Sequence, residues 1–163
     1  MNSLKYIFTT LFLLYLIVSI VFMIQFKIGC KDRLKRAADA NTIELAKEEL
    51  TAVISYLEEK NLTSGYTSVL YKTPDEDIGF WYKNLNSSFI ELKNVNQNSS
   101  QLEKSNILLK LRETILDDSK NGTSVTSPDG ISKYPFNTIF ALWGLFSFII
   151  STFLWIRFCV EEY

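Results

Sequence analysis

The stretch Tyr6–Phe26, YIFTTLFLLYLIVSIVFMIQF, contains no charged residue, and it decides the class of fold to which this chain belongs. A second uncharged stretch, Tyr134–Ile156, YPFNTIFALWGLFSFIISTFLWI, lies near the other end. Each exceeds the ~20 residues that a helix needs to cross a bilayer, and core helices of soluble proteins rarely lack charge over such a length. Because backbone groups in lipid must be hydrogen-bonded within their own segment, we expect transmembrane helices over 6–28 and 134–156.

The first apolar stretch is better explained as a permanent anchor than as a signal peptide. Signal peptides have an apolar core of about 7–15 residues, and this stretch is longer. Five basic residues separate it from the A-x-A sequence Ala38–Ala40. The chain therefore divides into a short tail over 1–5, the first span, a soluble segment over 29–133, the second span and a short tail over 157–163.

Apolar residues recur at helical spacing in three parts of the soluble segment, which predicts helices at about 31–60, 74–95 and 100–118. The first stripe consists of Ile43, Ala46, Leu50, Val53 and Leu57, the second of Ile78, Trp81, Leu85, Phe89 and Leu92, and the third of Ile107, Leu108, Leu111 and Ile115, widened by Leu109 and Leu116. Three such stripes can be buried against one another. The predicted fold is therefore all-α, with two transmembrane helices flanking a small three-helix bundle anchored to the membrane.

Capping signals mark the starts of the predicted helices. Asn41 and Glu44 have capping-box spacing, which indicates that the first helix bends or starts afresh near Asn41. In the stretch Thr73–Glu76 a capping Thr is followed by Pro at the first helical position and Glu at the third. Ser100 and Glu103 form a second capping box.

The residue types present exclude several catalytic chemistries. The chain has no histidine, and its two cysteines, Cys30 and Cys159, follow different spans, so neither a histidine base nor a thiolate zinc site is expected within one chain. Motifs for a nucleophile elbow, a dinucleotide or a P-loop are absent too, and we expect no enzyme, no cofactor and no metal. The acidic cluster Asp75–Asp77 could bind a divalent cation or serve a carboxylate-based enzyme. Capping of the second helix is favoured because it also explains Thr73 and Pro74.

Aromatic residues are densest at Phe80, Trp81 and Tyr82, and Tyr66 and Tyr71 precede them. Three consecutive residues cannot all face one side of a helix, so at least one of the three rings points away from the core. The five rings are therefore candidate contacts for a partner. The alternative, that the preceding connector folds back over them, is favoured.

Five basic residues follow the first span, namely Lys27, Lys31, Arg33, Lys35 and Arg36. Lys and Arg near the ends of spans tend to stay in the cytoplasm, where they can also contact anionic headgroups. We favour a topology signal over specific lipid recognition. The cluster favours a cytoplasmic soluble segment, but an extracytoplasmic one stays open because long segments cross membranes largely regardless of charge.

Small residues recur along one face of the second span at Ala141, Gly144, Ser147 and Ser151. A face of this kind lets helices approach closely in lipid. The expected neighbour is the first span, or the same span in a second copy of the chain. Chance in a stretch rich in Phe and Ser explains the pattern equally well.

Three stretches, LKRAADANTIELAKEEL (34–50), LTSGYTSVLYKTPDEDIGFWYKNL (62–85) and QLEKSNILLKLRETILD (101–117), resemble a family of small, uncharacterised bacterial two-span membrane proteins. The resemblance implies a bacterial cytoplasmic membrane and assigns no functional residue. A net charge of −1 gives no reason to expect a nucleic-acid partner. We expect a non-enzymatic, membrane-anchored interaction or scaffold protein whose partners are the bilayer and a second copy or another membrane protein. An extracytoplasmic sensor or binding domain held between two spans is the alternative.

Overall fold

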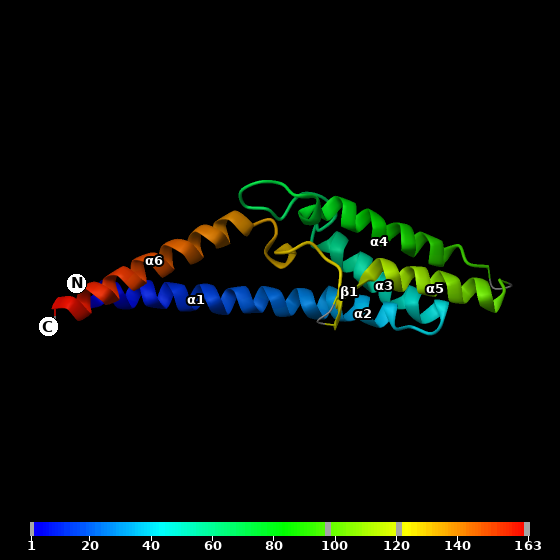
Figure 1. Ribbon diagram of the computed structural model, residues 1–163, viewed down its shortest axis with the longest axis horizontal. Coiled ribbons are helices and arrows are strands. Elements are labelled where there is room, and N and C mark those ends of the chain that lie inside the picture. The colour runs from blue at the N-terminus through cyan, green and yellow to red at the C-terminus, as the bar shows by residue number, and fades with distance from the viewer. Residues whose placement is uncertain (1, 97–98, 120–121, 162–163) are drawn as a thin grey trace.

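The computed structural model describes residues 2–96, 99–119 and 122–161, and the chain is mostly helical (Figure 1). The α-helices are α1 (Asn2–Phe26), α2 (Asp32–Ala38), α3 (Ile43–Glu59), α4 (Ile78–Lys93), α5 (Gln101–Ile115) and α6 (Asn137–Glu161). Two strands, β1 (Leu116–Ser119) and β2 (Gly122–Val125), follow α5. Three short turns complete the fold: a π-helical turn η1 (Lys27–Lys31) and two 3-10 turns, η2 (Pro74–Glu76) and η3 (Ile131–Lys133). The predicted tail over 157–163 extends past the described residues.

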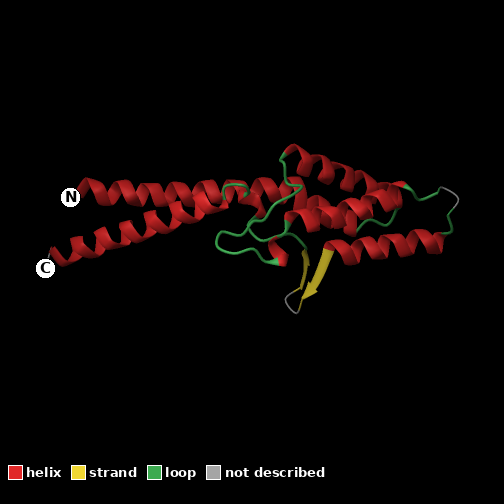
Figure 2. Cartoon of the chain, turned by 90° about the horizontal axis from the view of Figure 1, so that it is seen from above, coloured by secondary structure: helices red, strands yellow, loops and turns green. Residues whose placement is uncertain are grey.

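The helices α1 and α6 lie side by side and bring both ends of the chain to one end of the molecule (Figures 1 and 2). Two helices are long and apolar enough to cross a membrane. The first runs from Ser3 to Ala38, because α1 continues through η1 into α2 without a break. The second begins at Asn137, three residues after the predicted start. Tyr134 is extended and Pro135 has no N–H to donate, so the helix starts beyond them.

The π-helical turn lies where α1 passes into the rest of the fold, and it brings the chain close to α3. A Cβ atom on Gly29 would overlap the ring of Tyr56, so only glycine permits this approach. The Phe26 ring lies 6.4 Å from the Tyr56 ring, centroid to centroid, and Cys30 is fully buried behind them. We call the part from Asp32 to Lys133 the head.

The first predicted helix, 31–60, is broken in the structure. The helix α2 ends at Ala38, and α3 begins at Ile43 and packs back against α2. The cap is Thr42 and not Asn41, because Thr42 is extended and its hydroxyl accepts a hydrogen bond from the N–H of Leu45 at 3.3 Å. The spacing therefore indicated the fresh start correctly but placed its cap one residue early.

The second predicted helix also starts later than its sequence signal. The stretch Pro74–Glu76 forms only the turn η2, and α4 begins at Ile78 with Asp77 as its cap. The carboxylate of Asp77 accepts from the N–H of Phe80 at 3.0 Å. The hydroxyl of Thr73 bonds instead to the Glu76 carboxylate at 2.6 Å, which stabilises the turn before the helix.

The helix α5 starts as predicted, with the Ser100 hydroxyl accepting from the N–H of Glu103. It ends at Ile115 and not near Asp118, because Leu116 is extended and begins β1. The strands β1 and β2 pair antiparallel, with Leu116 opposite Val125. This hairpin was not predicted, since its residues are mostly polar and show no alternation of apolar and polar side chains.

One hydrophobic core draws on α2, α3, α4 and α5, and it buries the first two predicted stripes completely. In the third stripe Leu111 and Ile115 are buried, Ile107 and Leu108 are half-buried, and Leu109 is exposed, so the predicted widening by Leu109 is wrong. The helix α5 is thus the most peripheral of the four.

Candidate functional site

A groove of about 720 Å³ opens on the head where the connector before α4, the start of α4 and the segment after β2 meet. Its lining residues are Tyr66, Lys72, Thr73, Pro74, Asp75, Asp77, Phe80, Trp81, Asn84, Leu85, Thr114, Asp117, Thr126, Ser127 and Pro128. We call it the head groove. It combines three of the five predicted partner-contact residues with three carboxylates.

Trp81 forms the floor of the head groove. Its ring is buried, and its indole N–H donates to the carbonyl of Thr126 at 2.9 Å. Thr126 is held in turn, because its N–H and its hydroxyl both donate to the carbonyl of Ile115. The unpredicted hairpin therefore returns the chain to the position that fixes the floor.

Phe80 and Tyr66 form the aromatic rim. Phe80 is 64% exposed although it neighbours the buried Trp81. Tyr66 is held by the backbone, since it forms an antiparallel bridge with Asp77 and the N–H of Ile78 donates to Gly65. The connector pairs with the start of α4 and leaves the Phe80 ring in solvent.

The head groove is anionic. Asp75, Asp77 and Asp117 line it, and among the described residues none of the three forms an ion pair. The charge of Asp77 and its hydrogen bond raise the pKa of Tyr66. Lys72 is the one cation among the described lining residues, and its ammonium lies 4.8 Å from the centroid of the Tyr66 ring. An ammonium over an aromatic face next to carboxylates is the contact that a bound cation would make.

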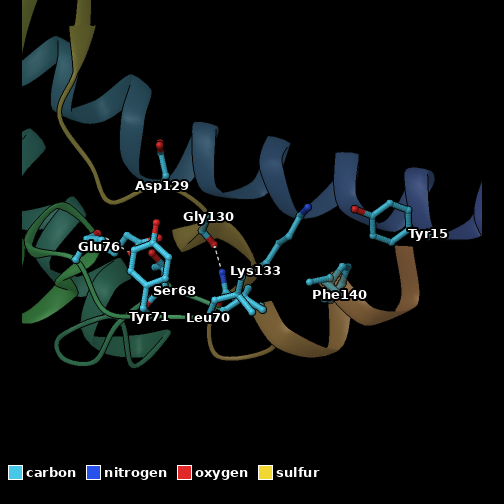
Figure 3. Close-up of a pocket in the computed structure, with 14 residues that line it drawn as sticks. Tyr15, Ser68, Leu70, Tyr71, Glu76, Asp129, Gly130, Lys133 and Phe140 are labelled. Carbon is cyan, nitrogen blue, oxygen red and sulfur yellow. Dashed lines mark hydrogen bonds between the residues drawn. The ribbon is translucent and has the colours of Figure 1, made fainter. Parts of the chain in front are cut away.

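The other two predicted partner contacts lie elsewhere. The hydroxyl of Tyr82 donates to the Glu58 carboxylate on α3 at 2.8 Å, and Tyr82 faces away from the head groove. Tyr71 is strongly exposed and lines a separate cavity with Lys133 (Figure 3). The sequence missed Thr126 and Asp117, because only the folded hairpin brings them to Trp81.

The five predicted basic residues lie in three different surroundings. Arg33 and Arg36 both pair with Glu49 on α3, whose side chain is almost buried. Lys27 and Lys31 line a cavity of about 500 Å³ together with Lys133 from η3. Lys35 is exposed and completes the cluster.

Lys133 was missed by the sequence argument. Its ammonium lies 5.6 Å from the Tyr15 ring centroid, so it reaches from η3 toward α1. The signal was present, because Lys133 is the last charged residue before the second apolar stretch. Lys27, Lys31 and Lys133 together place positive charge where both long helices meet the head.

The four small residues predicted to form one face of α6 have different surroundings in the structure. A Cβ atom on Gly144 would lie 2.7 Å from the Tyr15 ring, and the hydroxyl of Ser151 lies 3.0 Å from that of Thr9. Ser147 is buried and donates to the carbonyl of Trp143 in its own helix. Ala141 is exposed. Of the two predicted neighbours, the first span is the one that the structure places beside Gly144 and Ser151.

Aromatic rings fill the rest of the contact between α1 and α6. Phe12 lies 5.4 Å from Phe148, and Phe22 lies 5.5 Å from Phe140, centroid to centroid. At the terminal end Lys5 is buried with its ammonium against aromatic rings of α1 and α6, 4.8 Å from the centroid of Trp155. This caged lysine was not predicted, because the cage draws on both ends of the sequence.

The arrangement supports binding chemistry. Within the described ranges, no three His, Cys, Asp or Glu side chains gather in a way that could hold a metal ion. Asp77 caps α4 and Glu76 accepts from Thr73 in η2, so both carboxylates have structural roles, although Thr73 is not the helix cap that the sequence predicted. No family model, curated protein or solved structure matches this chain. The case for a function therefore rests on the geometry of the head groove and of the two long helices.

Proposed function

We propose that this protein is a non-enzymatic, membrane-anchored interaction protein whose head groove binds a Lys- or Arg-bearing segment of a partner protein. Its anchors are α1 and α6, and its head acts as a three-helix unit of α3, α4 and α5 braced by α2. The observation that carries the proposal is the juxtaposition of the exposed Phe80 ring with the carboxylates of Asp75 and Asp117, which form no ion pair with the described residues.

The chemistry of the head groove favours a cation over other ligands. Aromatic faces attract Lys and Arg by about 0.5–1 kcal/mol at exposed sites, and carboxylates add charge-assisted hydrogen bonds. Three carboxylates face one ammonium in the lining, so the groove keeps negative charge after Lys72 is counted. The contact of Lys72 with Tyr66 is an internal example of the proposed contact.

Peptide binding tests the proposal directly. The full chain would be placed in nanodiscs of neutral phosphatidylcholine and titrated with a fluorescent peptide of alternating Arg and Gly, and with its Glu–Gly counterpart. We expect the Arg peptide alone to bind. Phe80→Ala and Asp117→Asn should each weaken that binding about fivefold, since each removes about 1 kcal/mol. Both positions are solvent-exposed, so the variants should fold.

The matched control is Tyr71→Ala, which removes an exposed ring outside the head groove. It should bind the Arg peptide as tightly as the parent chain. Equal binding of the Arg and Glu peptides, or unchanged affinity of Phe80→Ala for the Arg peptide, would contradict binding of a cationic segment in the head groove.

We further propose that the head faces the cytoplasm, since Lys27, Lys31 and Lys133 adjoin the head ends of both long helices. Labelling of intact cells with a membrane-impermeant maleimide tests this orientation. Cys30 is fully buried and unsuitable, so the label belongs on Ser64→Cys, an exposed position in the connector, in a chain whose exposed Cys159 is replaced by Ser. Protection of Ser64→Cys is the expected result, and labelling would place the head outside.

An extracytoplasmic binding or sensor domain is the second candidate. The unbroken rod from Ser3 to Ala38 favours it, because a displacement in the head would be carried along the helix into α1. Labelling at Ser64→Cys would support this candidate over the first.

A further inference from the structure

The connector between α3 and α4 carries three consecutive exposed apolar side chains at its tip. Leu70 is 90% exposed, Tyr71 is 74% exposed, and Val69 is exposed beside them. The neighbouring polar part of the same connector is held in place, since the N–H of Thr67 donates to the carbonyl of Glu76. The apolar tip is therefore presented on a fixed base and is left without cover by the head.

The tip lies level with the start of α6. In Figures 1 and 2 the connector before α4 turns back along the long axis of the molecule and reaches the first turn of α6. Leu70 and Tyr71 line a cavity of about 490 Å³ together with Lys133 and with Asn137 and Phe140 of α6 (Figure 3). Residues far apart in sequence thus meet at the end of the second long helix.

This level coincides with the expected surface of a bilayer. The 25 residues of α6 are about 37 Å long, against a hydrocarbon core of about 30 Å, so its first turn belongs at the boundary between lipid and water. Phe136 and Ile139 at that turn are exposed apolar residues, and Lys133 precedes them. An apolar tip beside this turn meets headgroups and the upper part of the acyl chains.

The residue types of the tip suit that boundary. Tyrosine is enriched at membrane interfaces because its ring is apolar and its hydroxyl stays hydrated. Leucine gains free energy when its apolar surface leaves water. Lys133 lies across the cavity, so an ammonium group adjoins the level of the lipid phosphates.

We propose that Val69–Tyr71 inserts its side chains into the interface of the bilayer that α1 and α6 cross, as a third membrane contact of the chain. The inference rests on the membrane anchoring proposed above. Lys72 and Thr73, which follow the tip, line the head groove. A connector held in the interface would therefore hold the groove close to the membrane surface, within reach of a partner that is itself membrane-bound.

Depth-dependent quenching tests the contact on the full chain. Cys159→Ser removes the exposed native thiol, and Cys30 is buried. Leu70→Cys, Leu102→Cys and Leu13→Cys would each carry an environment-sensitive fluorophore. Leu102 is the matched control, since it is 72% exposed at the start of α5, and Leu13 lies on the exposed surface of α1. The bilayers would contain lipids with a nitroxide near the headgroup or near the end of the acyl chain.

We expect the shallow nitroxide to cause a loss of fluorescence at position 70 and the deep nitroxide to cause one at position 13, with neither loss at position 102. A fluorophore at position 70 that is quenched no more than one at position 102, while position 13 is quenched, would overturn the third contact and leave the anchoring intact. Absence of quenching at position 13 would overturn the anchoring and, with it, the inference.

Discussion

The two packed regions of this molecule are built from different residues. The core of the head is mainly aliphatic, although it also contains Trp81 and Phe89, and Leu34, Leu50 and Leu57 are fully buried in it. The seam between α1 and α6 consists of aromatic rings, a glycine and paired hydroxyls, such as Tyr15 on Gly144 and Thr9 with Ser151. Both regions join helices, but only the head shows the apolar stripes of water-soluble helices.

The difference follows from the proposed surroundings. In water, burial of aliphatic surface stabilises a contact whatever the details of its shape. Two helices in lipid do not gain this stabilisation, because the lipid tails are as apolar as leucine. Close packing and hydrogen bonds between the helices then stabilise their contact. Four substitutions test these two kinds of packing.

Leu50→Ala should destabilise the head by about 3 kcal/mol, because it leaves a cavity in a core that cannot collapse fully. Leu50 is fully buried in α3. Thermal unfolding in detergent, followed by circular dichroism, measures the loss. Leu45→Ala on the same helix is the control, since Leu45 is half exposed. Equal losses in the two variants would contradict an aliphatic core at α3.

Gly144→Leu should separate α6 from α1 and cost about 2 kcal/mol, because the new side chain must displace the ring of Tyr15. Double electron–electron resonance between spin labels attached at positions Leu13 and Ile149, which are both exposed, measures the distance between α1 and α6. Ala141→Leu is the control at an exposed position about one turn earlier in the same helix, and it should leave the distance unchanged. An unchanged distance in Gly144→Leu would show that close approach is unnecessary at this seam.

Ser151→Ala should weaken the seam by about 0.6 kcal/mol, the average value for a hydrogen bond between helices in lipid. The hydroxyl of Ser151 lies 3.0 Å from that of Thr9. Ser147→Ala removes a hydroxyl that bonds within its own helix, and it serves as the control. The two variants would be compared by the denaturant concentration at which the α1–α6 contact is lost. A larger effect of Ser147→Ala than of Ser151→Ala would contradict a stabilising hydrogen bond between Ser151 and Thr9.

Tyr82→Phe should have the smallest effect and should appear only at high pH. Burial, with the hydrogen bond to Glu58, raises the pKa of Tyr82 above its ordinary value of 10.0. The folded state therefore retains a proton that the unfolded state releases, so stability is full below pH 10 and falls as pH rises through the folded-state pKa. The free energy of unfolding, measured across this pH range, should fall less steeply with rising pH in Tyr82→Phe than in the parent chain. An unchanged slope would mean that Tyr82 does not contribute to the pH dependence.

Local sequence signals predicted much of the head and failed at identifiable points. Ser100 caps α5 as its spacing indicates, and the stripes of α3 and α4 are buried. The signal at Thr73–Glu76 was assigned to the helix, but it builds a turn and Asp77 is the cap. Capping residues within a few positions of one another compete, and packing of Ile78 against the core decides between them.

The head groove was only partly visible in the sequence. Phe80, Trp81 and Tyr66 were candidates because aromatic residues cluster there. Tyr82 was grouped with them and points to Glu58 instead, since neighbouring positions on a helix face different sides. The sequence did not identify Thr126 and Asp117 as groove residues, because only the hairpin brings them into the groove with Trp81. The polar sequence of this hairpin does not predict strands.

The sequence alone was enough to predict two long apolar helices and the apolar stripes of α3 and α4, because charge and periodicity act within a few turns of chain. The tertiary structure alone decided that α3 folds back on α2, that Gly144 meets Tyr15, and that the connector before α4 reaches the start of α6. These contacts join residues far apart along the chain. Their free energy depends on shape and distance in space, which no local pattern records.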